Sequence, residues 1–171
     1  FSSLPGFFDI VVADVPCSGE GMFRKDEEAQ RQWSEDNVAL CQARQKRIIA
    51  DMWPCLKPGG ILIYSTCTFN RYENDDNVGW IAQELGAEHI LPLSEAMEGV
   101  IDTVHGYSLV PGHVEGEGQY CAALRKTSEV DSLAAMSVNP ARGRREKTGK
   151  KPALPVPVSL KSLFDVPVDL R

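Results

Sequence analysis

The chain has 171 residues, enough for one domain with a sizeable core, and its 43% hydrophobic and 25% charged residues are ordinary for a soluble globular protein. No signal peptide is visible, and the apolar runs reach only about six residues, far short of a membrane-spanning helix. The net charge of −6 argues mildly against a nucleic-acid partner. The chain opens with "FSSLPGFFDI", without an initiator methionine and with a strand almost at once, so we expect a piece cut from a longer protein.

Two apolar segments that end in polar residues are predicted to be strands. The first is "FFDIVVAD" at 7–14, a continuous apolar run that predicts burial on both faces, as in a parallel sheet, and Pro16 ends it. The second is "GILIYSTC" at 60–67, which repeats the same plan. Each segment is followed by a loop that begins near a cysteine.

A helix is predicted between these strands. Ser34 is its expected N-cap, and "KPGG" at 57–60 is expected to end it. Its apolar face is made by Val38, Cys41, Ile48, Ile49, Met52, Trp53 and Leu56. The order strand, helix, strand predicts a right-handed crossover between parallel neighbours. The link from roughly 15 to 35 is longer than a turn requires, and long ordered loops are often functional.

The elements that follow are shorter. We expect a second helix over 74–85, with Val78, Ile81 and Leu85 on one side, and a short strand in "EHILPL" at 88–93. Residues 94–118 are rich in glycine and predict no definite element. The segment 119–126, "QYCAALRK", is predicted to be the last strand.

The sequence pattern dissolves after this strand. We expect a linker over 127–153 and the start of a truncated C-terminal domain or tail over 154–171. The segment "RGRREKTGKK" at 142–151 carries a net charge of +5 and leaves −11 for the rest. It fits either a solvated linker or an electrostatic arm, and we favour the linker because charge runs are usually solvated.

The chain has five cysteines, at positions 17, 41, 55, 67 and 121. Their odd number, wide spacing and non-secretory context predict reduced thiols in the cytoplasm. The absence of a Cys-x-x-Cys pair argues against zinc, and we predict no metal site. Cys41, Cys55 and Cys121 fall within helical or strand patterns and are expected in the core.

Asp14, Cys17 and Cys67 follow the two predicted strands. Ligands of an open parallel sheet bind beyond the carboxyl ends of its strands, so the loops with these residues should lie side by side. One thiolate could attack an electron-poor carbon, a buried carboxyl could hydrogen-bond the adjacent ring nitrogen, and a second thiol could help release the product. These requirements fit methylation at carbon 5 of a pyrimidine, which is not nucleophilic until a group adds to carbon 6.

Three segments carry a resemblance to a known family. They are "DVPCSGEGMFRKD" at 14–26, "PCLKPGGILIYSTCTFNRYEND" at 54–75 and "VEGEGQYCAALRK" at 114–126. Together they resemble the RNA cytosine-5 methyltransferases of the NOL/NOP/Sun family, above all its bacterial ribosomal-RNA enzymes. The resemblance covers about 7–126. The paired Asp-x-Pro-Cys-Ser-Gly and Ser-Thr-Cys-Thr motifs make it specific, whereas either motif alone would be weak.

The resemblance implies a role for each of three site residues. Cys67 matches the nucleophile that attacks carbon 6 of cytosine, and Cys17 matches the cysteine that assists product release. Asp14 matches an acidic residue close to both the target base and the S-adenosylmethionine site, so it is a candidate catalytic and cofactor-binding residue. The implied partner is RNA, in the first place ribosomal RNA, and the target base would have to leave its stack.

Other residues of the first loop have weaker implied roles. Pro16 and Ser18 would shape the loop, and Arg24 and Lys25 are expected to meet RNA phosphates. Trp33, Trp53, Trp80, Tyr64 and Phe69 are expected to serve in packing rather than in base stacking.

The fold implied is α/β, the C-terminal part of a Rossmann-like S-adenosylmethionine-dependent methyltransferase sheet. Residues 1–126 would be the C-terminal half of the catalytic domain, truncated before the family's Gly-rich cofactor loop. The "GEG" sequences at 19–21 and 116–118 are no substitute, since neither lies between a first strand and its helix. We therefore expect that this piece cannot bind the cofactor tightly or turn over alone.

Two other functions remain open. One is an RNA-binding ribosome assembly factor of this fold without turnover, against which both motif cysteines argue. The other is a thiol hydrolase that pairs Cys67 with a histidine. His89, His105 and His113 all lie outside the two loops, so they are expected to be surface or hydrogen-bonded histidines rather than a base.

Overall fold

The computed structural model describes residues 3–90 and 98–127, all within the compact unit Phe1–Asn139. The predicted tail at 154–171, and the predicted linker except Thr127, lie outside the described residues. The strands are β1 (Phe8–Asp14), β2 (Leu56–Thr66), β3 (Ala87–Ile90), β4 (Val100–Asp102), β5 (Tyr107–Leu109) and β6 (Gln119–Lys126). The α-helices are α1 (Glu27–Gln32), α2 (Glu35–Met52) and α3 (Asp75–Glu84), and the 3₁₀ helices are η1 (Glu20–Met22) and η2 (Trp53–Cys55).

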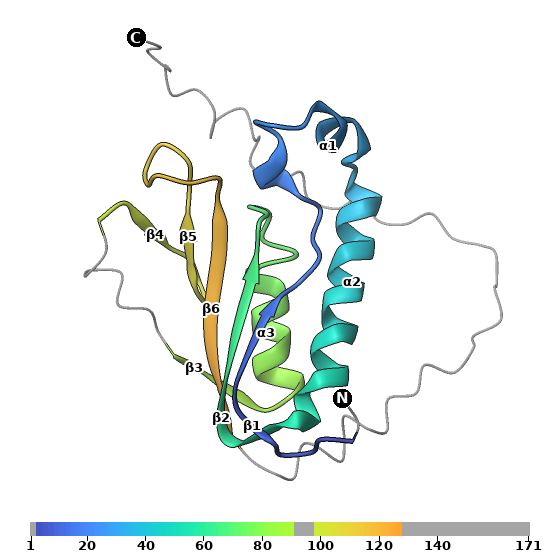
Figure 1. The fold of residues 1–171 in the computed structure, drawn as a ribbon, viewed down its shortest axis with the longest axis vertical. Coiled ribbons are helices and arrows are strands. Elements are labelled where there is room, and N and C mark those ends of the chain that lie inside the picture. Colours follow the sequence, from blue (N-terminus) through green and yellow to red (C-terminus); the bar gives the residue numbers. More distant parts are fainter. Residues whose placement is uncertain (1–2, 91–97, 128–171) are drawn as a thin grey trace, which may run out of the picture. The chain divides into compact units, whose positions relative to one another are not determined.

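One mixed sheet organises these elements (Figure 1). Its strand order is β1-β2-β6-β5-β4, and β3 also pairs with β6. β1 and β2 are parallel, as predicted from the strand–helix–strand order, and β6 is antiparallel to β2, β3 and β5. The predicted parallel arrangement therefore holds for the β1–β2 pair, and this pair carries both loops of interest.

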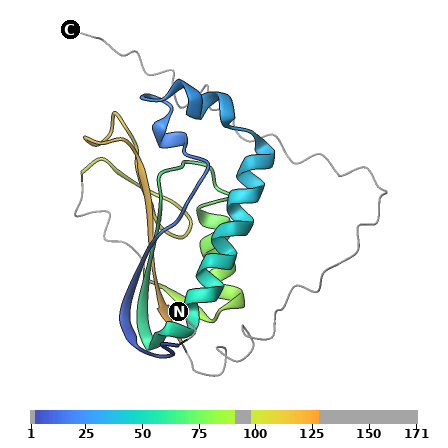
Figure 2. The same ribbon diagram turned by 45° about the vertical axis from the view of Figure 1, so that its right-hand side comes forward.

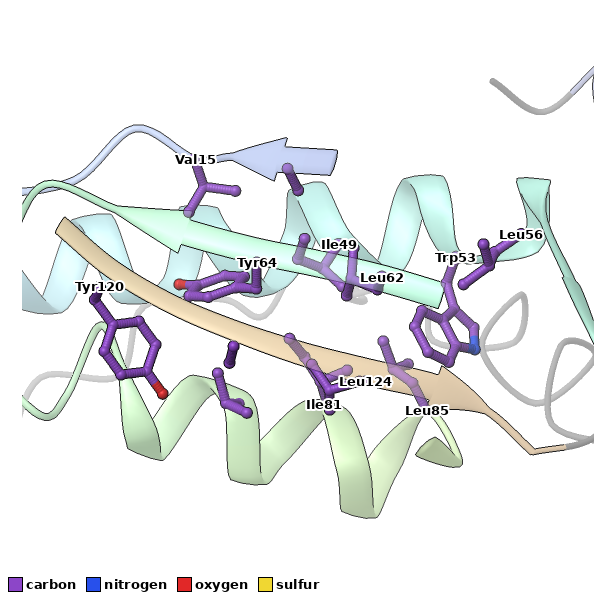
Figure 3. Close-up of a cluster of buried hydrophobic side chains, with 13 residues drawn as sticks. Val15, Ile49, Trp53, Leu56, Leu62, Tyr64, Ile81, Leu85, Tyr120 and Leu124 are labelled. Carbon is purple, nitrogen blue, oxygen red and sulfur yellow. The ribbon is translucent and has the colours of Figure 1, made fainter. Parts of the chain in front are cut away.

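Helices α2 and α3 lie on the same side of the sheet (Figure 2). Between them and the sheet lies the apolar core, to which β2 and β6 contribute Leu62, Tyr64, Tyr120 and Leu124 (Figure 3). The opposite side of β1 is open within the described residues, since Ile10 is 56% and Val12 is 66% exposed. The prediction that β1 is buried on both faces is therefore wrong here, because both helices cover only one face.

Helix α2 begins where predicted and ends earlier. The Ser34 side chain accepts a hydrogen bond from the Asn37 N–H, which satisfies one of the free donors of the first turn. The helix ends at Met52 and passes into η2, because Pro54 has no N–H to continue the ladder. The predicted stop "KPGG" instead belongs to β2, where the register with β1 shifts between Phe8 and Ile10. Gly59 supports this bulge with a φ of +75°.

The Gly-rich segment and the long first link hold elements that the sequence did not predict. The link contains η1 and α1, and the Asp26 side chain caps α1 by accepting from the Glu28 N–H. The segment 98–118 contains the short strands β4 and β5. Helix α3 and strand β6 are confirmed close to their predicted ends. None of the helices in residues 3–90 and 98–127 has the length and apolar character that crossing a membrane requires.

Candidate active site

The parallel pairing of β1 and β2 brings their two following loops together. Asp14 is in register with Ser65 at the carboxyl ends of the strands, and the Val15 N–H donates to the Ser65 carbonyl at 3.0 Å. The Sγ atoms of Cys17 and Cys67 then lie 3.2 Å apart, although the residues are fifty positions apart in the sequence. The predicted meeting of the two thiols is confirmed.

The two thiols have opposite shifts in acidity. The hydrogen bond from Cys17 lowers the pKa of Cys67 to about 7, against the effect of burial and of the Asp14 charge. The same contact with Cys67, together with burial, raises the pKa of Cys17 well above the ordinary thiol range. These shifts favour the thiolate form at Cys67 and the thiol form at Cys17, and the thiolate is the nucleophilic form of cysteine.

Asp14 lies beside this pair on the face of the sheet opposite the helices. Its Oδ1 accepts from the Ser65 hydroxyl at 2.9 Å and from Gln119 Nε2 at 3.5 Å. The side chain is exposed, so the expectation of a buried carboxyl is wrong. Together with Ser65 it forms the last residue pair of the β1–β2 ladder.

The register across β1, β2, β6 and β5 places four residues in one row. Ser65 pairs with both Asp14 and Cys121, and Cys121 pairs with Tyr107. Cys121 is only half-buried, and this corrects its assignment to the core; Cys41 and Cys55 are buried as expected. The correction has a simple cause, because Cys121 is on the sheet face that the helices do not cover.

A buried polar network lies beneath the two loops. Its carboxylates, Glu20 and Glu73, are 3% and 0% exposed. Each loop also contacts the other directly, because the hydroxyls of Ser18 and Thr68 lie 3.1 Å apart. The sequence analysis missed both glutamates. The only available signal was their place within the two motifs, since charged residues in polar loops ordinarily predict exposure.

Two glycines of the "GEG" sequences pack against the second loop. The Gly21 N–H donates to the Cys67 carbonyl at 2.8 Å, and a Cβ at this position would lie 2.6 Å from that oxygen. A Cβ on Gly118 would lie 2.2 Å from the Phe69 ring. These glycines therefore allow close approach of the chain to the loop that carries Cys67.

The remaining residues singled out in the sequence fall into three groups. Arg24 is exposed, whereas Lys25 forms an ion pair with Glu117. The packing roles of Trp53 and Tyr64 are confirmed, because both are buried in the core. Trp80 packs against the core, Phe69 lies against Gly118, and the Trp33 ring N–H donates to Glu20.

The histidines and the Cys67 sulfur have different partners. His89 and His105 stack on each other with ring centroids 4.3 Å apart, and the buried Nδ1 of His89 has no hydrogen-bond partner, contrary to expectation. The Cys67 sulfur is paired with a thiol rather than with an imidazole. In the part of the chain that the structure describes, no group of three or more His, Cys, Asp or Glu side chains is arranged to hold a metal ion.

Similarity to known proteins extends over most of the chain. Ribosomal RNA small subunit methyltransferase F of Klebsiella pneumoniae (strain 342) is 40% identical over 159 residues, which are 91% of this chain and 32% of that protein. The protein of the same name from Cronobacter sakazakii (strain ATCC BAA-894) is 41% identical over 138 residues, 78% of this chain and 29% of that protein. The chain thus spans about a third of the length of these curated relatives.

Solved structures share the fold. A methyltransferase homolog protein from Pyrococcus horikoshii aligns with a TM-score of 0.57 at 27% identity, over 70% of this chain and 39% of that chain. The structure of NSun6 from Pyrococcus horikoshii with SFG aligns with a TM-score of 0.54 at 21% identity, over 69% of this chain and 30% of that chain, which shows the fold alone. The predicted α/β class of Rossmann-like methyltransferase sheet is confirmed.

Residues 2–125 match the family described as 16S rRNA methyltransferase RsmB/F. The match covers both loops, the two thiols and Asp14, and it confirms the resemblance indicated by the paired motifs. The chain belongs to the 16S rRNA methyltransferase RsmB/F family.

Proposed function

We propose that this chain forms the catalytic half of an enzyme that transfers a methyl group to carbon 5 of a cytosine in ribosomal RNA. The observation that carries the proposal is the thiol pair, in which Cys67 has a pKa lowered to about 7 and lies 3.2 Å from Cys17. Membership of the RsmB/F family supports RNA methylation, and the names of the relatives support small-subunit ribosomal RNA. The reaction needs both thiols reduced, which fits the cytoplasm.

The first step is the addition of Cys67 to the base. Near neutral pH a large share of this thiol is ionised, because its pKa is about 7. The thiolate adds to carbon 6 of a flipped-out cytosine, a C–S bond forms, and electron density moves to carbon 5 and the ring nitrogen. Asp14, oriented by Ser65 at 2.9 Å, hydrogen-bonds the ring nitrogen through a carboxyl proton, which moves onto the nitrogen as negative charge develops there.

Cys17 assists the last step. After methylation, carbon 5 loses its proton, the C–S bond breaks, and its electron pair returns to the Cys67 sulfur. The hydrogen bond with Cys67 is the main cause of the raised pKa of Cys17. While the Cys67 sulfur is bound to carbon 6, it cannot accept this hydrogen bond as a thiolate, and this cause is removed. Cys17 then loses its own proton to water more readily than in the free enzyme, and the resulting thiolate accepts the proton that leaves carbon 5.

The cofactor of this reaction is S-adenosylmethionine, which supplies the methyl group when bound. A neighbour of the same fold was solved with SFG, an analogue of this cofactor. Asp14 is the residue of this chain that fits a contact with it, since an exposed carboxyl complements a cationic group. One carboxyl provides a single contact, and we infer that this chain alone neither binds the cofactor tightly nor turns over.

The proposal is tested in the full-length protein that contains this chain, with its ribosomal RNA. Cys67→Ser should abolish both methylation and covalent attachment, because the nucleophile is lost. Cys17→Ser should accumulate a protein–RNA adduct that survives a denaturing gel, because addition proceeds and release does not. Cys41→Ser, at a buried cysteine of α2, is the matched control and should methylate without an adduct.

Two results would contradict the role assignment. Full methylation by Cys67→Ser would exclude this thiol as the nucleophile, and the absence of an adduct in Cys17→Ser would exclude the helper role. An assembly factor without turnover would bind RNA equally in all variants and leave it unmodified.

A further inference from the structure

We propose that Glu20 and Glu73 are positioning residues that set the separation of the Cys17 and Cys67 thiols. Each glutamate belongs to one loop and fixes the backbone of the other. The inference deepens the proposed function and rests on it for its catalytic consequence. The effect of the two glutamates on the separation of the Cys17 and Cys67 sulfurs can be measured without RNA.

Glu73 belongs to the second loop and holds the first. Its Oε2 accepts from the Ser18 N–H at 3.0 Å and from Gln45 Nε2 at 2.6 Å, and its Oε1 accepts from Asn70 Nδ2 at 2.8 Å. The side chain is fully buried. Ser18 directly follows Cys17 in the sequence, so this carboxylate fixes the backbone next to the helper thiol.

Glu20 belongs to the first loop and holds the second. Its Oε2 accepts from the Phe69 N–H at 2.7 Å, and its Oε1 accepts from Trp33 Nε1 at 3.0 Å and from Asn70 Nδ2 at 3.1 Å. This side chain is also buried. Phe69 stands two residues after Cys67, so the second carboxylate fixes the backbone next to the nucleophile.

The choice of carboxylates fits this geometry. The partners of both glutamates are N–H donors, and an ionised carboxylate is acceptor-only. Burying a carboxylate costs free energy unless the carboxylate is paired or fully hydrogen-bonded. A loop can be closed without a buried carboxylate, so the presence of two of them indicates a further role. Asn70 donates to both carboxylates, at 3.1 and 2.8 Å, and so joins the hydrogen bonds of the two glutamates into one network. Glu73 accepts from the Ser18 N–H and Glu20 from the Phe69 N–H, so both glutamates position the thiols through the backbone. The charge of Glu73 also raises the pKa of Cys67.

Glu73→Gln and Glu20→Gln test the inference in the full-length protein. Glutamine keeps the size of the side chain but turns one acceptor into an N–H donor, which then faces donors such as the Ser18 or Phe69 N–H. Diamide measures the thiol separation chemically: it takes one hydrogen from each thiol as the Cys17–Cys67 bond forms, and peptide mass spectrometry follows the product. We expect each variant to slow this reaction about tenfold, since small displacements of reacting atoms have effects of this order or larger.

The matched control is Ile81→Val, a substitution in the core on α3, away from both loops. This substitution lowers stability without changing the hydrogen bonds of Glu20 and Glu73. Its rate of Cys17–Cys67 disulfide formation with diamide should therefore stay within about twofold of wild type. All rates are compared at a temperature at which every variant is folded. If a glutamine variant does not fold, Glu73→Asp replaces it in the test. Aspartate keeps the charge on a shorter side chain, so it should also slow the formation of the Cys17–Cys67 disulfide.

Catalysis provides the second readout. Each glutamine variant should lower kcat with KM for RNA within about twofold, because binding of RNA is unchanged while the thiols are misplaced. Glu73→Gln should also accumulate some of the adduct seen in Cys17→Ser. Wild-type diamide rates in the glutamine variants would overturn the positioning role. Slowed diamide rates without any adduct in Cys17→Ser would leave the positioning role standing and overturn the proposed function.

Discussion

At the scale of single residues, the thiol of Cys67 has surroundings unlike those of the other half-buried or buried cysteines. The hydrogen bond from Cys17 lowers its pKa to about 7. Burial instead raises the pKa of both Cys41 and Cys121. The hydrogen bond from one neighbouring thiol is therefore the main cause that lowers the pKa of Cys67.

This difference predicts a pH profile for alkylation. The rate at which iodoacetamide modifies Cys67 should rise with pH through about 7 and then level off, because only the thiolate reacts. Cys17→Ala removes the donor and should move the midpoint up towards the ordinary thiol value of about 8.5. Cys17→Ser keeps a donor and is the matched control, with a midpoint below that of Cys17→Ala. Peptide mass spectrometry resolves the sites, and equal midpoints in wild type and Cys17→Ala would refute the assigned cause.

At the scale of elements, the 3₁₀ helix η1 packs against the second loop. The N–H of its Gly21 donates a hydrogen bond to the Cys67 carbonyl at 2.8 Å. Backbone atoms lie too close to this glycine for any side chain, since a Cβ would be 2.6 Å from that oxygen. The first loop is therefore fixed to the second by its backbone as well as by its glutamates.

Gly21→Ala should separate the two loops. The clash is with backbone, so one loop has to move, and we expect a loss of activity of about a hundredfold in the full-length enzyme, as misplacement of catalytic groups by about 1 Å has such effects. Stability should fall by about 1–3 kcal/mol. Gly6→Asn is the control: it has open space and a φ of +59° that asparagine tolerates. Wild-type activity in Gly21→Ala would contradict this arrangement.

The elements that the sequence predicted are those with long apolar patterns. Each of these elements buries an apolar face, and the spacing of its apolar residues predicts the element from the sequence. They are β1, β2, α2, α3 and β6. The short strands β4 and β5 have no such pattern, and η1 and α1 are mostly polar. Glu20 and Glu73 were missed for another reason: the backbone N–H groups that they bind, of Phe69 and Ser18, are about fifty positions away in the sequence. Only the folded chain brings these groups together. The meeting of the two thiols was predictable because strands joined by one crossover are usually neighbours, and because the paired motifs marked both cysteines.

At the scale of the whole molecule, we propose that this chain forms only part of the catalytic site. β1 is an edge strand with Ile10 and Val12 more than half exposed, and exposed apolar edges of sheets are surfaces that proteins usually cover. The chain also spans about a third of its curated relatives. The described residues supply the thiols and one carboxyl, and the remainder of the cofactor site is expected in the rest of the protein.

A calorimetric titration with S-adenosylmethionine tests this expectation. The isolated chain should show no binding in the micromolar range, because Asp14 provides a single contact, whereas the full-length protein should bind in that range. Asp14→Asn in the full-length protein should weaken binding about tenfold, as expected for one charged contact. Micromolar binding by the isolated chain would show that it holds a complete cofactor site.

The central claim is that the Cys67 sulfur bonds to the target cytosine while Cys17 is needed to release it. The most direct measurement is peptide mapping by mass spectrometry of the RNA adduct trapped by full-length Cys17→Ser after nuclease digestion. We predict a methylated cytidine nucleotide on the peptide that contains Cys67 and on no other cysteine. A nucleotide attached to a different residue, or an adduct that persists in Cys67→Ser, would contradict the account.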